Sequence, residues 1–223
     1  MNRRRFILAG SAAGLAVIAG IGLADSWPGR RQPVRILAFG DSLTEGYGVP
    51  PDQAIPGQLQ TWLRSKGVNA EVINAGLSGD TTYGGRVRIN WAMRAQPDAV
   101  IVELGGNDFL RGFDLTAIER NLSAIIRRAG REGAPVLLVG IAPPDDRMPV
   151  SRAKVEAMWQ RLAKKHKVLL LPDLYAPLWQ KPESQWSTYL QEDQTHLSPA
   201  GVTLMISELG PLALQLVGQI AAE

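Results

Sequence analysis

The hydrophobic residues of this chain gather in short runs that recur along the sequence. Each run is four to six residues long, is rich in Val, Ile and Leu, and lies between polar or glycine-containing segments. Near-continuous apolar runs of this kind predict strands that are covered on both faces, as in a parallel sheet. The predicted strands are Val34–Phe39, Ala70–Asn74, Ala99–Leu104, Val136–Ile141 and Val168–Leu171.

Between these runs, apolar residues recur at the spacing of a helix, and we interpret them as core-facing stripes. One stripe consists of Leu115, Ile118, Leu122, Ile125 and Ile126, and another of Val155, Met158, Trp159 and Leu162.

A last helix is predicted after Ser198 and Pro199, which suit its N-cap and first turn. Its apolar face consists of Val202, Met205, Ile206 and Leu209. Gly210 and Pro211 are expected to break or kink this helix before the segment Leu212–Ala222. Strand and helix thus alternate over five units, which predicts a three-layer α/β/α sandwich with a five-stranded parallel sheet.

The N-terminal residues have the pattern of an export leader that precedes the domain. Residues 1–5 are basic and residues 6–23 carry no charge, so residues 1–24 are predicted to be a signal peptide. The adjacent arginines also resemble a twin-arginine signal. An uncleaved anchor in the inner membrane over residues 6–23 is the alternative. Residues 25–33 are predicted to be a linker, and residues 34–223 the domain of a periplasmic or secreted protein.

Charge and composition exclude several classes of function. Of the 24 Lys and Arg residues, three lie in the leader, so 21 basic residues face 21 acidic ones in the rest of the chain. The basic balance therefore belongs to the leader, and no nucleic-acid partner is predicted. The chain has no cysteine and only two histidines, which argues against a thiolate nucleophile and against a zinc site, and no cofactor is predicted.

Polar and glycine-rich segments follow the predicted strands. They are Gly40-Asp41-Ser42, the loop Ala75–Thr82, Gly105-Gly106-Asn107-Asp108 and, before the last helix, Asp193-Gln194-Thr195-His196. Because the carboxyl ends of parallel strands share one edge of the sheet, a hydroxyl, an amide and a carboxylate–imidazole pair are expected to meet there. Each segment taken alone is also an ordinary turn or cap sequence.

A serine nucleophile requires a base, and the choice between the two histidines is clear. His166 lies among lysines at a predicted helix end, where we expect it to be solvated, whereas His196 lies on a loop. Asp193 precedes His196 by three residues and is preferred to Glu192 as the residue that orients the imidazole.

Acyl transfer also requires hydrogen-bond donors for the developing oxyanion. The candidates are the backbone N–H of Ser42, the backbone N–H of Gly79 and the side-chain amide of Asn107. A turn glycine and a turn asparagine are the alternative interpretations. Asp41 and Asp108 are expected to orient loops and not to react.

Taken together, these segments resemble the GDSL, or SGNH, hydrolase family. The resemblance rests on Gly40-Asp41-Ser42-Leu43, Gly79, Gly105-x-Asn107-Asp108 and Asp193-x-x-His196, in that order along nearly the whole domain. The longer runs Gly40–Gly48 and Leu104–Gly112 are similar to the bacterial thioesterase I, arylesterase and lysophospholipase L1 enzymes.

The resemblance implies a flavodoxin-like fold in which Ser42, Asp193 and His196 form the triad and Ser42, Gly79 and Asn107 the oxyanion hole. His196-Leu197-Ser198 departs from the His-Pro-Asn of many relatives, a change that falls after the base. The Gly-x-Ser-x-Gly elbow of α/β-hydrolases is absent.

The expected substrate is a small aryl or acyl ester, a thioester or a lysophospholipid. The segments Phe109–Phe113 and Tyr175–Leu190, the second with Trp179, Trp186 and Tyr189, could line an acyl pocket or pack against the sheet edge. A carbohydrate or peptidoglycan O-acetyl esterase and a non-catalytic envelope binding protein are the competing hypotheses. No protein partner is predicted, and membrane contact is expected only through the leader.

Overall fold

The computed structural model describes residues 32–142 and 150–220, whose strands form one five-stranded parallel sheet in the order β2-β1-β3-β4-β5. The leader and nearly all of the predicted linker lie outside the described residues. The strands are β1 (Val34–Gly40), β2 (Ala70–Gly76), β3 (Ala99–Glu103), β4 (Val136–Val139) and β5 (Leu169–Leu171). All five predicted strands are therefore confirmed.

The strand ends differ from the prediction by one or two residues. β2 continues to Gly76 because Ala75 and Gly76 still pair with Phe39 and Gly40 of β1. β4 ends at Val139, the last residue that pairs with β3. Beyond these points the chain leaves the sheet to form loops, so the apolar residues that follow pack without strand pairing.

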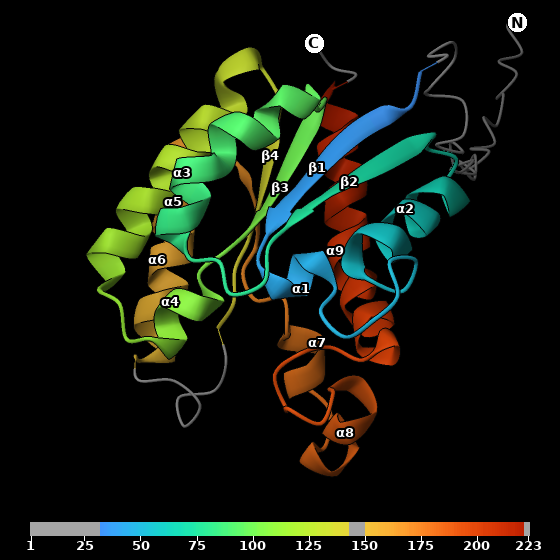
Figure 1. Cartoon of the computed structure of the whole chain (residues 1–223), viewed down its shortest axis with the longest axis vertical. Helices are drawn as coiled ribbons and strands as arrows, with labels where there is room; N and C mark the ends of the chain where they lie inside the picture. The colour runs from blue at the N-terminus through green and yellow to red at the C-terminus, as the bar shows by residue number, and fades with distance from the viewer. Residues whose placement is uncertain (1–31, 143–149, 221–223) are drawn as a thin grey trace, which may run out of the picture.

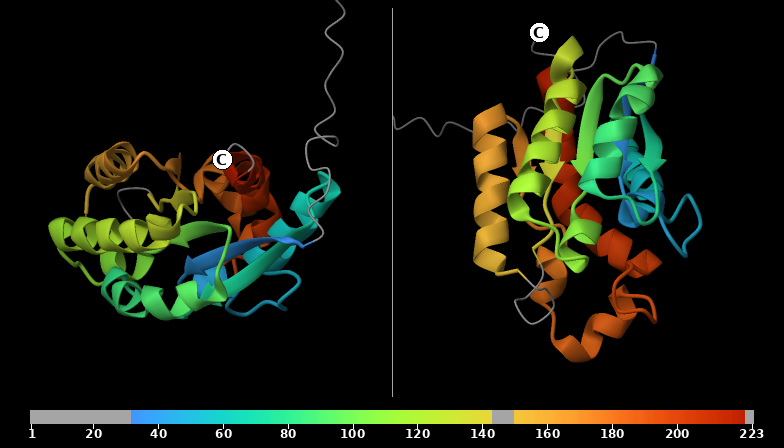
Figure 2. Two further views of the ribbon diagram at one scale, coloured as in Figure 1. Left: turned by 90° about the horizontal axis from the view of Figure 1, so that it is seen from above. Right: turned by 60° about the vertical axis from the view of Figure 1, so that its left-hand side comes forward.

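Helices cover both faces of the sheet (Figure 1). The helices α3 (Thr82–Ala92), α5 (Leu115–Ala129) and α6 (Arg152–His166) lie side by side on one face, as the right-hand view of Figure 2 shows. The helices α2 (Ile55–Ser65) and α9 (Pro199–Ile220) cover the other face. Four short helices lie at the carboxyl edge: α1 (Ser42–Glu45), α4 (Gly106–Leu110), α7 (Ala176–Trp179) and α8 (Trp186–Tyr189).

Burial follows the stripes that the sequence predicts. On α5, Ile118, Leu122, Ile125 and Ile126 are buried, and all four stripe residues of α6 are buried as well. Together with alternate residues of β1, β3 and β4 they form one apolar layer, while α2 and α9 form the other against the opposite face. The two layers hold the sheet rigidly, so its carboxyl edge is a stable base for loops.

Of the predicted break or kink at Gly210 and Pro211, the break is wrong, because α9 runs without interruption from Pro199 to Ile220. Pro211 has no N–H for the carbonyl of Ser207, but both residues lie on the exposed face, where water can satisfy that carbonyl. Gly210 lies on the buried face, where a Cβ atom would come within 2.8 Å of the Trp62 ring. This close contact with α2 holds α9 along the sheet. α9 is long and apolar enough to span a membrane, but half of its apolar window is buried in the fold.

Pro211→Ala is expected to raise the free energy of unfolding by about 2 kcal/mol. Alanine restores the missing helical hydrogen bond and is about 3 kcal/mol more favourable than proline inside a helix, and the loss of proline's restraint on the unfolded chain offsets part of this gain. Urea unfolding followed by circular dichroism measures the change. Gln215→Ala, on the same exposed face, should change the value by less than about 0.5 kcal/mol. A less stable Pro211→Ala protein would contradict the explanation.

Candidate active site

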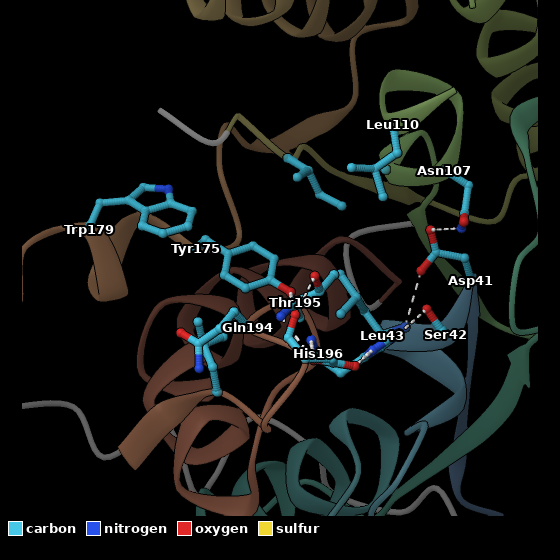
Figure 3. A pocket seen from close by; sticks show the side chains of 14 residues that line it. Asp41, Ser42, Leu43, Asn107, Leu110, Tyr175, Trp179, Gln194, Thr195 and His196 are labelled. Carbon is cyan, nitrogen blue, oxygen red and sulfur yellow. Dashed lines mark hydrogen bonds and ion pairs between the residues drawn. The ribbon is translucent and has the colours of Figure 1, made fainter. Parts of the chain in front are cut away.

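Three segments that are far apart in the sequence meet at the carboxyl edge of the sheet (Figure 3). Ser42 begins α1 directly after β1, and Asn107 lies in α4 after β3. Asp193 and His196 lie on the loop that precedes α9. The convergence that the sequence predicts is therefore present in the fold.

The turn that carries Ser42 is fixed from both sides. Asp41 is the N-cap of α1, and its Oδ1 accepts a hydrogen bond from the Leu43 N–H at 3.1 Å. Gly46 ends α1 with φ +90°, a left-handed conformation that favours glycine. Before the turn, a Cβ atom on Gly40 would collide with the Thr44 hydroxyl and the Glu103 carbonyl. The Ser42 hydroxyl is thus presented from a tightly packed turn.

Ser42, His196 and Asp193 form one hydrogen-bonded chain. The Ser42 Oγ lies 2.9 Å from His196 Nε2, although the two residues are 154 positions apart. On the other side of the ring, His196 Nδ1 lies 2.5 Å from Asp193 Oδ2. In this arrangement the imidazole can take a proton from the serine while the carboxylate holds its orientation.

The loop around His196 is built so that Asp193 turns back onto the imidazole. Gln194 adopts φ +56°, an uncommon conformation for a residue with a side chain. The backbone N–H groups of Thr195 and His196 both donate to Asp193 Oδ1 at 2.9 Å. Partial burial acts to raise the pKa of Asp193, but the hydrogen bonds from His196 and Thr195 outweigh it and lower the pKa below its usual value. Asp193 is therefore a carboxylate at neutral pH.

Two tyrosines contact the loop that carries His196. The ring of Tyr47 lies 4.6 Å from that of His196, measured between centroids. The Tyr175 hydroxyl donates to the Thr195 carbonyl at 2.7 Å. Burial, followed by nearby carboxylates, raises the pKa of Tyr175 well above its usual value, so it remains a neutral donor. The hydrogen bond from Tyr175, the N-cap residue of α7, therefore helps to hold the loop that carries His196.

Asn107 lies beside the turn that carries Ser42, and Asp41 orients its side chain. The Asn107 Nδ2 donates to Asp41 Oδ2 at 3.2 Å, which leaves its second N–H for another acceptor. Burial raises the pKa of Asp41 to about 6, while the bonds from Leu43 and Asn107 oppose the rise. Asp108 accepts from the Thr82 N–H and hydroxyl at 2.9 and 2.6 Å and so joins α4 to α3. Both aspartates make the loop-orienting contacts that the sequence suggests.

Gly79 lies on the loop after β2. It is exposed with φ +75°, and its carbonyl accepts from Arg111 at 3.2 Å. It is not among the described residues that line the cavity at Ser42. Its part in an oxyanion hole stays a prediction.

The side chain of Arg88, in α3, joins the loop after β2 to β1. Its guanidinium donates to the carbonyls of Gly40 and Ala75, each at 2.8 Å, and forms an ion pair with Asp80 at 2.7 Å. The same group lies 4.0 Å from the centre of the Phe39 ring. Arg88 therefore joins the carboxyl ends of β1 and β2 to α3.

Sequence reasoning missed a buried acid beneath the turn. Glu103, the last residue of β3, accepts from the Thr44 hydroxyl at 2.8 Å, while its Oε1 has no partner among the described residues. Burial, followed by the neighbouring Asp41, raises the pKa of Glu103 well above its usual value. A charged residue inside an otherwise apolar predicted strand was the signal that could have identified it.

A cavity of about 420 Å³ opens beside Ser42 and His196. Its apolar wall comes from both segments proposed for an acyl pocket and from neighbouring loops: Leu110, Ile141, Tyr175, Trp179 and Leu190. Trp186 is instead buried and Tyr189 half-buried against the core. Of these aromatic residues, Trp179 thus lines the cavity at Ser42, whereas Trp186 and Tyr189 pack against the core.

The second histidine is not fully solvated, contrary to expectation. His166 is half-buried at the end of α6, where its Nε2 lies 2.7 Å from the Ser123 hydroxyl. Burial, followed by Lys165 and Arg127, lowers the pKa of His166. It lies on α6 and contacts α5, whereas Ser42 lies at the carboxyl edge. Across residues 32–142 and 150–220, no three His, Asp or Glu residues gather as metal ligands.

Comparison with known proteins gives consistent matches. Residues 38–204 match the model of the GDSL-like Lipase/Acylhydrolase family. The chain is 35% identical over 182 residues to thioesterase 1/protease 1/lysophospholipase L1 of Escherichia coli (strain K12), which covers 79% of this chain and 84% of the relative. It is 33% identical over 166 residues to an arylesterase of Vibrio mimicus, with coverage of 74% and 80%.

Solved structures agree with these relatives. The crystal structure of TesA matches with a TM-score of 0.74 at 30% identity and covers 82% of this chain and 99% of that chain. The structure of AlinE4, an SGNH-hydrolase family esterase, matches with a TM-score of 0.67 at 35% identity, with coverage of 84% and 98%.

Glu103→Gln is expected to become increasingly stabilising, relative to the unchanged protein, as the pH rises from 5 to 8. Because the folded pKa of Glu103 lies above its unfolded value, unfolding releases a proton, and stability is lost as the pH rises toward the folded pKa. Glutamine removes this loss, which is at most about 1.4 kcal/mol per pH unit. Melting temperatures at several pH values measure the difference.

Glu192→Gln, at an exposed position beside the histidine loop, is the matched control. Its stability relative to the unchanged protein should vary little over the same pH range. If the difference in melting temperature between Glu103→Gln and the unchanged protein did not vary with pH, Glu103 would ionise as an ordinary carboxyl group.

Proposed function

The chain belongs to the GDSL-like lipase/acylhydrolase family and is a carboxylic ester hydrolase, and we propose that Ser42, His196 and Asp193 form its catalytic triad. The family and the fold predicted from the sequence motifs are thereby confirmed. The observation that carries the proposed triad is the hydrogen-bonded chain from the Ser42 hydroxyl through the imidazole to the Asp193 carboxylate.

In the proposed reaction, the Ser42 Oγ attacks the acyl carbon while His196 Nε2 takes the serine proton. The imidazolium is stabilised by Asp193 and then gives the proton to the departing alcohol or thiol, which leaves an acyl group on Ser42. Water attacks the acyl-enzyme, His196 accepts a proton from the water, and the acid is released as Ser42 recovers its proton. The reaction requires no metal or cofactor.

The oxyanion of each tetrahedral intermediate is proposed to bind the N–H groups of Ser42 and Gly79 and the Asn107 side chain. The free N–H of Asn107 beside the nucleophile turn supports its part. For Gly79, the support is the family motif, together with a conformation and an open environment that expose its backbone.

The substrate is proposed to be an aryl or acyl ester, a thioester or a lysophospholipid, with the acyl chain in the cavity beside Ser42. Its apolar lining supports a hydrocarbon chain, and its volume falls in the range of sites for small molecules. An O-acetyl esterase acting on polysaccharide would instead need polar groups for sugar hydroxyls. We propose that the enzyme acts outside the cytoplasm, on the strength of the predicted leader in residues 1–24.

Hydrolysis of p-nitrophenyl esters from acetate to longer acyl chains tests both the nucleophile and the pocket. Ser42→Ala is expected to lower kcat by at least about 10⁴-fold on every ester, because the acyl-enzyme can no longer form. The unchanged enzyme should prefer chains longer than acetate. Ser207→Ala, at an exposed site on α9, is the control and should keep full activity.

Two outcomes would contradict this proposal separately. Unchanged hydrolysis by Ser42→Ala would exclude Ser42 as the nucleophile. Release of acetate from an acetylated polysaccharide, with little turnover of longer acyl esters, would leave the triad in place and favour the O-acetyl esterase.

Asn107→Ala is expected to lower kcat by about 10²–10³-fold with a small change in KM, because an oxyanion donor acts mainly in the transition state. Steady-state kinetics with p-nitrophenyl butyrate measure both values. Asn90→Ala, on the exposed surface of α3, is the matched control. An equal rise in KM with unchanged kcat would instead indicate that Asn107 binds the ground state.

A further inference from the structure

An exposed apolar stripe runs along α3. Tyr83, Val87 and Trp91 are spaced four residues apart, so they lie on one face of the helix, and their side chains are 65%, 65% and 68% exposed. The buried residues of α3, such as Gly85 and Ile89, lie on the opposite face. The stripe therefore contributes nothing to the core that α3 covers.

Further exposed apolar side chains extend the stripe toward the catalytic cavity. Leu77 lies on the loop before α3, Leu110 is the last residue of α4, and Phe113 lies on the loop after α4. The bonds from Thr82 to Asp108 and from Arg111 to Gly79 hold these segments together. Leu110 is 62% exposed and also lines the cavity beside Ser42. The stripe thus ends at the mouth of the site.

The charge along α3 has one sign, whereas the exposed carboxylates Glu45 and Asp114 lie beside Leu77 and Phe113. From Thr81 to Pro97 the sequence contains no acidic residue. Arg86 on α3 and Arg94, in the 3-10 turn Met93–Ala95 directly after it, are both exposed. Arg111 is exposed beside Leu110. Aromatic and aliphatic side chains flanked by arginine are suited to the interface of a bilayer with an anionic surface. A symmetric contact between two copies of this chain through the stripe would bring the arginines of both copies into one interface.

We propose that the α3 stripe docks the enzyme onto an anionic lipid surface. The stripe consists of Tyr83, Val87 and Trp91, and it is flanked by Arg86 and Arg94. The three apolar side chains enter the interface, and the arginines contact lipid phosphates. Docking in this orientation places the cavity mouth at Leu110 beside the lipid. That consequence for access of lipid esters rests on the proposed function, whereas docking itself does not.

The absence of cysteine from the chain allows a site-specific test. Full-length Val87→Cys is labelled with an environment-sensitive fluorophore and mixed with vesicles of phosphatidylglycerol and phosphatidylcholine. The emission is expected to shift to the blue, and less so with vesicles of phosphatidylcholine alone. Gln215→Cys, exposed on α9 across the sheet, is the matched control and should not shift. Since both proteins carry the same leader, adsorption through the leader cannot account for a difference.

Two further variants in the Val87→Cys background separate the contribution of the arginine charge to docking from that of the aromatic side chains. Arg94→Gln should raise the lipid concentration at half-saturation about fivefold, the effect of removing one cation near an anionic surface. Tyr83→Ser combined with Trp91→Ser should abolish the shift. Neither change should alter hydrolysis of soluble p-nitrophenyl butyrate, so loss of docking is distinguishable from loss of the catalytic site or of the fold.

Three results would overturn the proposal. One is the absence of a shift at position 87 with anionic vesicles. Another is an equal shift with both kinds of vesicle that persists in the Arg94→Gln protein. The third is a shift without vesicles that grows with protein concentration, which would assign the stripe to self-association.

Discussion

The hydrogen bonds from Arg88 to the carbonyls at the ends of β1 and β2 are the constraint on which the site depends. The Gly40 carbonyl also accepts from the Leu77 N–H at 3.1 Å, so both of its lone pairs are used. With Asp80 as its ionic partner, the guanidinium is compensated in a poorly hydrated position. Ser42 follows Gly40 by two residues, so its place at the sheet edge is set by main-chain contacts.

The site combines contacts within one short loop with a contact between residues far apart in the sequence. Asp193 and His196 are arranged by one short loop, whose backbone N–H groups and left-handed Gln194 fix the carboxylate under the imidazole. The contact of this loop with Ser42 is long-range and depends on α9 packing along the sheet. Asp193 and His196 therefore form a local unit that the fold places beside Ser42.

Much of this arrangement could be predicted from the sequence, because apolar runs and stripes reflect burial on the two faces of a parallel sheet. The order of polar segments after the strands indicated which residues meet. The continuity of α9 through Pro211 could not be predicted, because it depends on which face of the helix meets solvent. The hydrogen-bond partners of Glu103 and His166 could not be predicted either, because each bond joins residues that are distant in the sequence.

The separation of Ser42 and His196 also has a consequence for the order of synthesis. Ser42 begins α1 just after the first strand, whereas His196 lies on the loop before the last helix. A chain still emerging from the ribosome carries the hydroxyl long before it carries the imidazole. Even a nearly complete polypeptide lacks the packing of α9 that brings the two together. On the proposed mechanism, the nascent protein therefore hydrolyses no ester until its carboxyl-terminal helix has been translated and docked.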